Sequence, residues 1–155
     1  MDSIKRILAA VDFSVYSSHI LEYAAWVAEQ TSAEIIAVSV INKRLMESVE
    51  KVFNDQHPGM FSRKKYLNDE ISRRTKSLDE LIKESVPGHI KTSVVIVDGV
   101  PFEEIIAAVI HQKADLLVIA PKGRTNLPDR LFGTTSEKVF RHSPIPVLSL
   151  NTPHK

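Results

Sequence analysis

Five short runs of almost continuous apolar residues are spaced along the chain, and polar or amphipathic segments separate them. Runs of this length and composition are typical of strands that are buried on both faces of a parallel sheet. We therefore expect strands at residues 4–11, 34–41, 90–97, 115–120 and 145–150.

Apolar residues recur at helical spacing in the segments between these runs. One helix is expected between the first two runs, with Ser14, Ser17 or Ser18 as its N-cap. Two amphipathic helices, separated at Pro58 and Gly59, should follow the second run. The next helix should begin at Pro101, because proline is favoured at the first helical position. A short helix at residues 134–142 should precede the last strand.

The alternation of strands and helices predicts an α/β fold, a three-layer α/β/α sandwich around a five-stranded parallel sheet. The chain has 155 residues, of which 43% are hydrophobic, so we expect a single domain over residues 1–155 with one core. In open parallel sheets, ligands bind beyond the carboxyl ends of the strands, where the strand order reverses. Candidate functional residues are therefore sought at the strand ends.

Charge and cysteine content exclude several classes of function. Twenty basic and nineteen acidic residues give a net charge of +1, which does not favour binding to nucleic acid or to a membrane surface. The absence of cysteine excludes a disulfide framework, a thiolate zinc site, an iron–sulfur cluster and a cysteine nucleophile. The apolar run near the N-terminus is too short for a signal peptide or a membrane span, so we expect a cytoplasmic protein.

One stretch, residues 63–76, has a local charge of +4. Tyr66 is its only aromatic residue. The main interpretation is a helix face exposed to solvent, and the alternative is a contact with an anionic partner.

The most informative segment begins at residue 120, at the end of the fourth predicted strand, and ends at residue 136 in the last predicted helix. Gly123 and Gly133 would let backbone N–H groups approach an anion, and Thr134, Thr135 and Ser136 would add hydroxyls beside the unpaired amides of a helix N-terminus. A phosphate group fits this chemistry. The alternative is structural: Gly123 makes a turn and Gly133 starts a helix. Neither Walker A nor GxGxxG is present.

The spacing in this segment resembles the C-terminal signature of the universal stress protein family, G-2x-G-9x-G-[ST]. Gly123, Gly133 and Thr134 match it, whereas Ala120 stands at the position of the first glycine. The resemblance extends over the whole chain. It also includes Asp12, Gly99-x-Pro101, Ala114-Asp115-Leu116, Ser136-Glu137-Lys138-Val139 and Arg141-His142-Ser143-Pro144.

This resemblance implies a sheet in the order 3-2-1-4-5, as in adenine nucleotide alpha hydrolase-like and other Rossmann-like folds. It also implies a homodimer formed through the last strand, from Pro146 to Leu150. One subgroup of the family binds ATP, and other members bind no nucleotide. The implied binding residues are Asp12 at the adenine or ribose edge, the backbone of Val40 at adenine, Ala10 and Val11 in the base pocket, Ile119 and Ala120 under the ribose, and Gly123, Gly133, Thr134, Thr135 and Ser136 around the phosphates.

Asp12 has a second interpretation, and so do Lys122 and Arg124, two further candidates for contact with phosphate. Asp12 could instead cap the following helix, and Arg124, with Lys122, could be solvated rather than attracted to phosphate. Ala120 is the departure from the signature. If the glycine only lets the ribose come close, alanine lowers the affinity modestly. If it requires a positive φ, alanine adds about 1–3 kcal/mol of strain.

Three other functions compete with nucleotide binding. A phosphoacceptor receiver domain could use Asp98, but Asp12 has no acidic neighbour to help hold magnesium, and Lys122 follows the fourth strand, one strand too early. An enzyme is disfavoured, because no paired carboxylates or Ser–His–Asp set is evident and Asp129 is the only candidate metal ligand in the phosphate loop. An interaction module would bind no nucleotide and act through its dimer surface or residues 43–66.

Taken with the resemblance, the sequence favours a cytoplasmic homodimer that binds an adenine nucleotide, ATP first among them, as a regulatory ligand in a stress response without efficient catalysis. Magnesium could accompany the ATP, and we expect no tightly bound metal. Nucleic acid and membranes are not expected partners. The main alternative is the dimeric interaction module.

Overall fold

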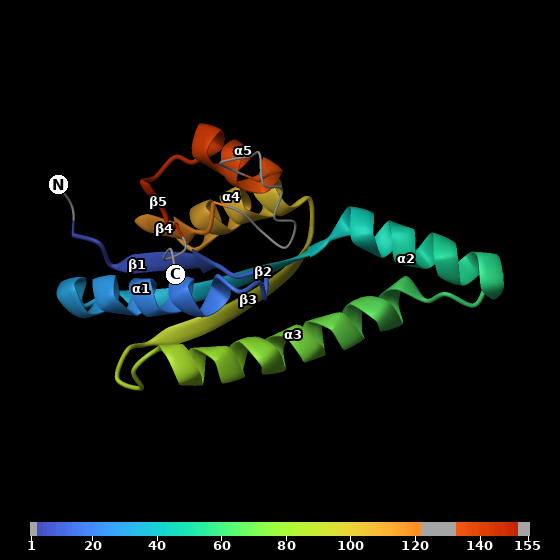
Figure 1. Ribbon diagram of the computed structural model, residues 1–155, viewed down its shortest axis with the longest axis horizontal. Coiled ribbons are helices and arrows are strands. Elements are labelled where there is room, and N and C mark those ends of the chain that lie inside the picture. Colours follow the sequence, from blue (N-terminus) through green and yellow to red (C-terminus); the bar gives the residue numbers. More distant parts are fainter. Residues whose placement is uncertain (1–2, 122–132, 152–155) are drawn as a thin grey trace.

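A parallel sheet in the order β3-β2-β1-β4-β5 lies at the centre of the molecule, as Figure 1 shows. The computed structural model describes residues 3–121 and 133–151. All four pairs of neighbouring strands are parallel. The α/β fold and the strand order expected from the sequence are thus confirmed. The strands are β1 (Arg6–Ala10), β2 (Glu34–Asn42), β3 (Thr92–Gly99), β4 (Leu116–Ile119) and β5 (Val147–Ser149).

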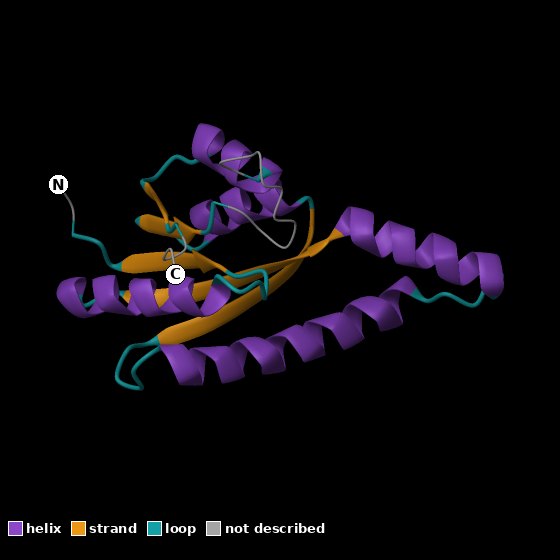
Figure 2. Ribbon diagram, viewed as in Figure 1, coloured by secondary structure: helices purple, strands orange, loops and turns teal. Residues whose placement is uncertain are grey.

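Helices cover both faces of the sheet, which gives the three expected layers (Figure 2). On one face lie α1 (Ser17–Thr31) and α3 (Arg63–Ser85), and on the other lie α4 (Pro101–His111) and α5 (Thr134–His142). In the part of the chain that the structure describes, no helix combines the length and the apolar composition that a membrane span needs.

The core is divided between these two faces because successive side chains of a strand point to opposite sides. On β1, Ile7 and Ala9 face the cluster that contains the buried side chains of α1 and α3, whereas Leu8 faces the cluster of α4 and α5. Ile7, Leu8 and Ala9 are all fully buried. This double burial explains why the strand sequences are apolar throughout rather than alternating.

The strand order reverses between β1 and β4. The chain places β2 and β3 on one side of β1 and then crosses to place β4 and β5 on the other side. The carboxyl ends of β1 and β4 consequently diverge into connections that cover opposite faces, which opens a crevice at this edge of the sheet.

Helix α2 (Lys43–Gln56) extends beyond the sheet together with the first turns of α3 (Figure 1). We call residues 43–66 the arm. Phe61 connects its two helices, because its ring contacts Phe53 on α2 and Tyr66 on α3. One apolar stripe of α2 is exposed, formed by Leu45, Val49, Val52 and Phe53.

Two local expectations were wrong. The N-cap of α1 is Tyr16, whose side chain makes no capping bond, and not Ser14, Ser17 or Ser18. Two of the hydroxyls are engaged elsewhere: Ser17 Oγ donates to Asp12 Oδ1 at 3.4 Å, and Ser14 Oγ accepts from Tyr16 N at 3.3 Å. The strands β1, β4 and β5 are also shorter than their apolar runs, because pairing with the neighbouring strands covers only part of each run. Strand β3 covers residues 92–99 instead of the expected 90–97.

Candidate nucleotide site

A cavity of about 380 Å³ lies at the carboxyl ends of β1, β2 and β4 and beside the start of α5. Ten of the predicted site residues belong to the described part of the chain, and all ten line this cavity: Ala10, Val11, Asp12, Val40, Ile119, Ala120, Gly133, Thr134, Thr135 and Ser136. The predicted residues Gly123 and Arg124, and the neighbouring Lys122, lie outside the described residues.

At the end of β1, the backbone turns from the sheet into the loop that leads to α1. Val11 N donates to Val38 O at 2.9 Å, which keeps this segment against β2. Asp12 lines the cavity while its Oδ1 accepts from Ser14 and Ser17. Asp12 therefore orders the loop before α1, without being the N-cap, and also contributes a carboxylate to the cavity wall.

The first turn of α5 forms the opposite end of the cavity. Gly133 is the N-cap, and Thr134, Thr135 and Ser136 follow in the first turn. The first amides of a helix have no acceptor within the helix, and the helix dipole makes this end partly positive. Ser136 Oγ donates to Ala120 O at 2.8 Å, which fixes the helix start to the end of β4. An anionic group fits this end of the cavity.

Ala120 has an ordinary backbone conformation. Among the described residues, the non-glycine positions with positive φ are Phe13, Ser32 and Lys113. Of the two mechanisms considered for the missing glycine, strain from a positive φ is therefore excluded for this chain. The methyl group of Ala120 on the cavity wall is the remaining difference.

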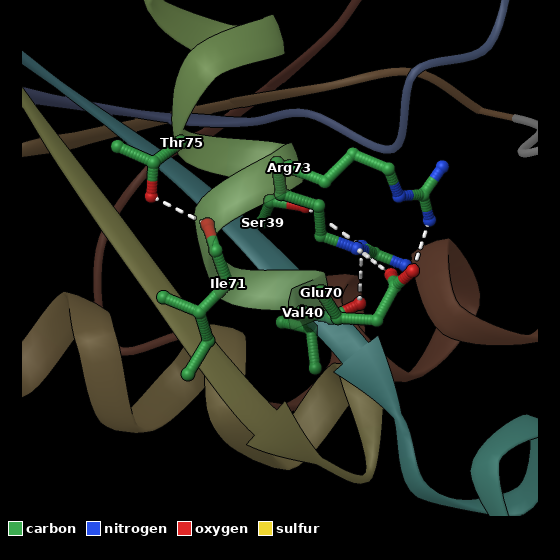
Figure 3. A network of polar contacts seen from close by, with 7 residues as sticks. Ser39, Val40, Glu70, Ile71, Arg73 and Thr75 are labelled. Atoms are coloured by element: carbon green, nitrogen blue, oxygen red, sulfur yellow. Dashed lines mark hydrogen bonds and ion pairs between the residues drawn. The ribbon is translucent and has the colours of Figure 1, made fainter. Parts of the chain in front are cut away.

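Arg74 is a cavity residue that the sequence analysis missed. It belongs to the stretch that was interpreted mainly as a solvated face, yet its side chain is only 11% exposed. Its Nη1 donates to Ser39 Oγ at 2.9 Å and to Val40 O at 3.1 Å, and its Nε donates to Glu70 Oε2 at 3.0 Å, in the network that Figure 3 shows. The solvated interpretation is wrong for Arg74. It fits Arg63 and Arg73, whose side chains are 51% and 70% exposed.

Glu70 holds this network together because it accepts from both Arg73 and Arg74. Burial raises the pKa of the Glu70 carboxyl, but the hydrogen bonds and positive charges of Arg73 and Arg74 lower it more, so the pKa lies below the ordinary value of 4.5. Glu70 is consequently ionised at neutral pH, and it keeps the guanidinium of Arg74 in place.

The competing receiver-domain interpretation does not agree with the topology. Receiver domains place the first and third strands side by side, in the order 2-1-3-4-5. Here β2 separates β3 from β1, and Asp98, near the end of β3, is exposed and is not among the residues that line the cavity. Within residues 3–121 and 133–151, no group of three histidine, aspartate or glutamate side chains is arranged to hold a metal ion.

Comparison with known proteins supports the same fold. The sequence profile of the universal stress protein family matches residues 3–150. Universal stress protein MJ0577 of Methanocaldococcus jannaschii is 27% identical over 161 aligned residues, which cover 93% of each protein. The solved structure of MJ0577 superposes with a TM-score of 0.77 at 26% identity, over 99% of this chain and all of the other.

Two other solved universal stress proteins with this fold are nucleotide complexes. One is a complex with cAMP, with a TM-score of 0.66 and 20% identity over 96% of this chain and 98% of the other. The second, from Archaeoglobus fulgidus, is a complex with dAMP, with a TM-score of 0.63 and 14% identity over 97% of this chain and all of the other. At these identities the likeness shows a shared fold.

Proposed function

The chain belongs to the universal stress protein family, and on this premise we propose that it is a regulatory protein that binds an adenine nucleotide, with ATP as the first candidate. The observation that carries the proposal is the cavity, which joins apolar walls at the ends of β1, β2 and β4 to the start of α5. Its volume of about 380 Å³ lies within the usual range for small-molecule sites.

The two ends of the cavity suit the two ends of a nucleotide. Ala10 and Val38 provide apolar contact for a flat base. The first turn of α5, from Thr134 to Ser136, provides backbone amides and hydroxyls for phosphate oxygens. The complexes with cAMP and dAMP support the choice of adenine, since those proteins share the fold.

We assign the nucleotide a regulatory role rather than that of a substrate. Contact through backbone amides neutralises phosphate charge, but it does not position a water molecule or a general base for hydrolysis. Bound ATP should therefore persist. Steady phosphate release faster than about one per second, a modest rate for an enzyme, would overturn this assignment.

Calorimetry with ATP, with and without Mg²⁺, tests the proposal. We expect the protein to bind ATP and the Gly133→Val variant to bind none. Gly133 has φ −70° and ψ 164°, which any residue adopts, so valine should leave the fold intact while it fills space at the start of α5. Gly88→Val is the matched control, because nothing lies within 4 Å of a side chain added at Gly88. Equal ATP binding by the two variants would contradict this site.

The alternative function, an interaction module that binds no nucleotide, is favoured by one observation. The apolar stripe on the arm is exposed, with Leu45 at 55% and Val52 at 61% of their full accessibility. If calorimetry detects no heat of ATP binding to the unmodified protein, nucleotide binding is rejected and this alternative takes its place.

We further propose that two copies of the chain pair through β5. This strand forms one edge of the sheet, and among the strands of residues 3–121 and 133–151 β4 is its only neighbour. An unpaired edge exposes backbone N–H and C=O groups that a second copy can satisfy. Native mass spectrometry of the purified protein would report the dimer mass and any nucleotide that remains bound.

A further inference from the structure

Arg74 uses only part of its hydrogen-bonding capacity within the protein. A guanidinium carries five N–H donors. The Nε donor binds Glu70, and the two Nη1 donors bind Ser39 Oγ and Val40 O. Among residues 3–121 and 133–151, no acceptor bonds to Nη2. A residue that lines the cavity thus retains two donors for a ligand.

The guanidinium is held in one position before any ligand arrives. Its side chain is 11% exposed and is paired with the ionised Glu70. On another side, the Phe13 ring centroid lies 5.9 Å from Cζ of Arg74, a cation–π distance. Phe13 has φ 60°, an uncommon conformation for a bulky residue and one that is often found at functional sites.

Arg74 lies at the end of the cavity that is remote from α5. It bonds to Ser39 and Val40 at the end of β2, whereas α5 follows β4, and β1 separates β2 from β4 in the sheet. The phosphate end and the Arg74 end are therefore on opposite sides of the central strand. A nucleotide with its phosphates at α5 would direct its base toward Arg74.

We propose that Arg74 recognises the base, by donating from Nη2 to one of the two adenine ring nitrogens that flank the 6-amino group. The proposal rests on the proposed adenine-nucleotide function of this cavity. Adenine presents an amino donor beside a ring-nitrogen acceptor. Arg74 and Val40 present the complementary pair, because Val40 O accepts one bond from Arg74 and a carbonyl has a second lone pair. Arg74 is thereby a specificity-determining residue of the site.

The test compares ATP with 7-deaza-ATP and 1-deaza-ATP, which each lack one of the two ring nitrogens beside the amino group. Calorimetry on the unmodified protein should show weaker binding of one analogue, by about tenfold, as expected for a bond from a charged donor. In Arg74→Met, ATP affinity should fall by about tenfold and the difference between ATP and that analogue should disappear.

Arg73→Met is the matched control. Arg73 also contacts Glu70, but its side chain is 70% exposed and it does not belong to the residues that line the cavity. This variant should keep both the ATP affinity and the difference between ATP and the deaza analogue. Arg74→Lys provides a second test in case the methionine variant does not fold. Lysine retains a positive charge beside Glu70 but lacks the planar set of guanidinium donors. This variant should therefore also lose the difference in affinity between ATP and the deaza analogue.

Equal binding of ATP and both deaza analogues by the unmodified protein would overturn the proposal. If Arg74→Met and Arg74→Lys bind ATP and both analogues more weakly by the same factor, Arg74 has a merely structural role and the proposal is overturned. Unchanged ATP affinity in these variants would overturn it as well, while nucleotide binding would stand. A failure of the unmodified protein to bind ATP would instead reject the proposed function, and the role of Arg74 with it.

Discussion

Arg73 and Arg74 are adjacent on α3 and both contact Glu70, but their surroundings differ. Arg73 lies in solvent, whereas Arg74 is covered by Phe13 and bonded to the end of β2. Exposed ion pairs contribute little to stability because water screens them, whereas breaking a buried network leaves unpaired groups behind. Most of the stability that this cluster contributes to the fold therefore comes from the bond between Glu70 and Arg74.

Glu70→Gln should lower the free energy of unfolding at pH 7 by about 1.5–3 kcal/mol, the range for a lost hydrogen bond to a charged group. The pKa of Glu70 is depressed below 4.5 in the folded protein. Its carboxylate thus contributes stability that is fully present above the unfolded value and is lost as the pH falls through the folded pKa. The difference in free energy of unfolding between the parent protein and Glu70→Gln should therefore shrink below pH 4.5.

Urea unfolding at a series of pH values measures this difference. Glu137→Gln is a suitable control, because Glu137 and its partner Arg141 are 55% and 70% exposed and their pair should contribute little at any pH. A destabilisation by Glu70→Gln that stays constant from neutral to acid pH would contradict the role given to the carboxylate.

Ala120→Gly should increase ATP affinity by less than about tenfold, that is by less than about 1.4 kcal/mol. Ala120 has no positive φ, so the substitution relieves no backbone strain and only removes a methyl group from the cavity wall. Calorimetry on the parent and the variant gives the ratio directly. A hundredfold gain would mean that strain at this position had been underestimated.

The sequence predicts the strand-end residues of the cavity well, because the carboxyl ends of parallel strands meet at one edge of a sheet. Arg74 is different. It lies 34 positions after Val40, on a helix, among basic residues that are largely exposed. The spacing of Glu70 and Arg74 indicates only a pair on one helix face. Nothing in this local pattern indicates which cation of the stretch reaches the sheet.

Among the elements, helix boundaries follow their sequence signals more closely than strand boundaries do. Helix α4 begins at Pro101, and α5 covers the predicted residues 134–142. Proline and capping chemistry act locally, within one turn. A strand ends where its neighbour ends, so the three residues of β5 depend on β4 and not on the apolar run alone.

The connection from β3 to α4 depends on Gly99. Its φ is +152°, and a side chain added there would lie 2.6 Å from Glu104 Oε1. Gly99→Ala should therefore lower the free energy of unfolding by about 1–3 kcal/mol, through backbone strain and this contact. Urea unfolding of Gly99→Ala beside Gly88→Ala measures the effect. Gly88 has open space around it, so its substitution should change the free energy of unfolding little. Equal stabilities of the two variants would contradict the strain and the contact inferred at Gly99.

For the molecule as a whole, the open edge at β5 determines how copies can associate. Val147 and Leu148 pack against the two halves of the core, so charged residues there would damage the protomer itself. Ser149 offers a cleaner test. Leu150 N donates to Ile119 O on β4, and alternation along the strand turns the N–H of Ser149 away from β4.

Ser149→Pro should convert the proposed dimer to a folded monomer, because proline removes the outward N–H group without removing a bond to β4. Ser149→Ala keeps the N–H group and should remain dimeric. The Ser149 hydroxyl has no hydrogen-bond partner in the described part of the chain, so alanine loses no bond. Light scattering at tens of micromolar measures both masses. A monomeric parent protein, or a dimeric proline variant, would refute pairing through β5.

Helix α3 is continuous from the arm to the core. Near its start, Arg63 Nε bonds to Glu50 on α2 at 2.7 Å, near its middle Arg74 lines the cavity, and near its end Leu78 and Ile82 are buried against the sheet. A molecule that displaces α3 as a rigid unit by binding the arm would also move Arg74, and so change the affinity for whatever occupies the cavity. By thermodynamic reciprocity, the occupant must then change the affinity of the arm for that molecule by the same factor.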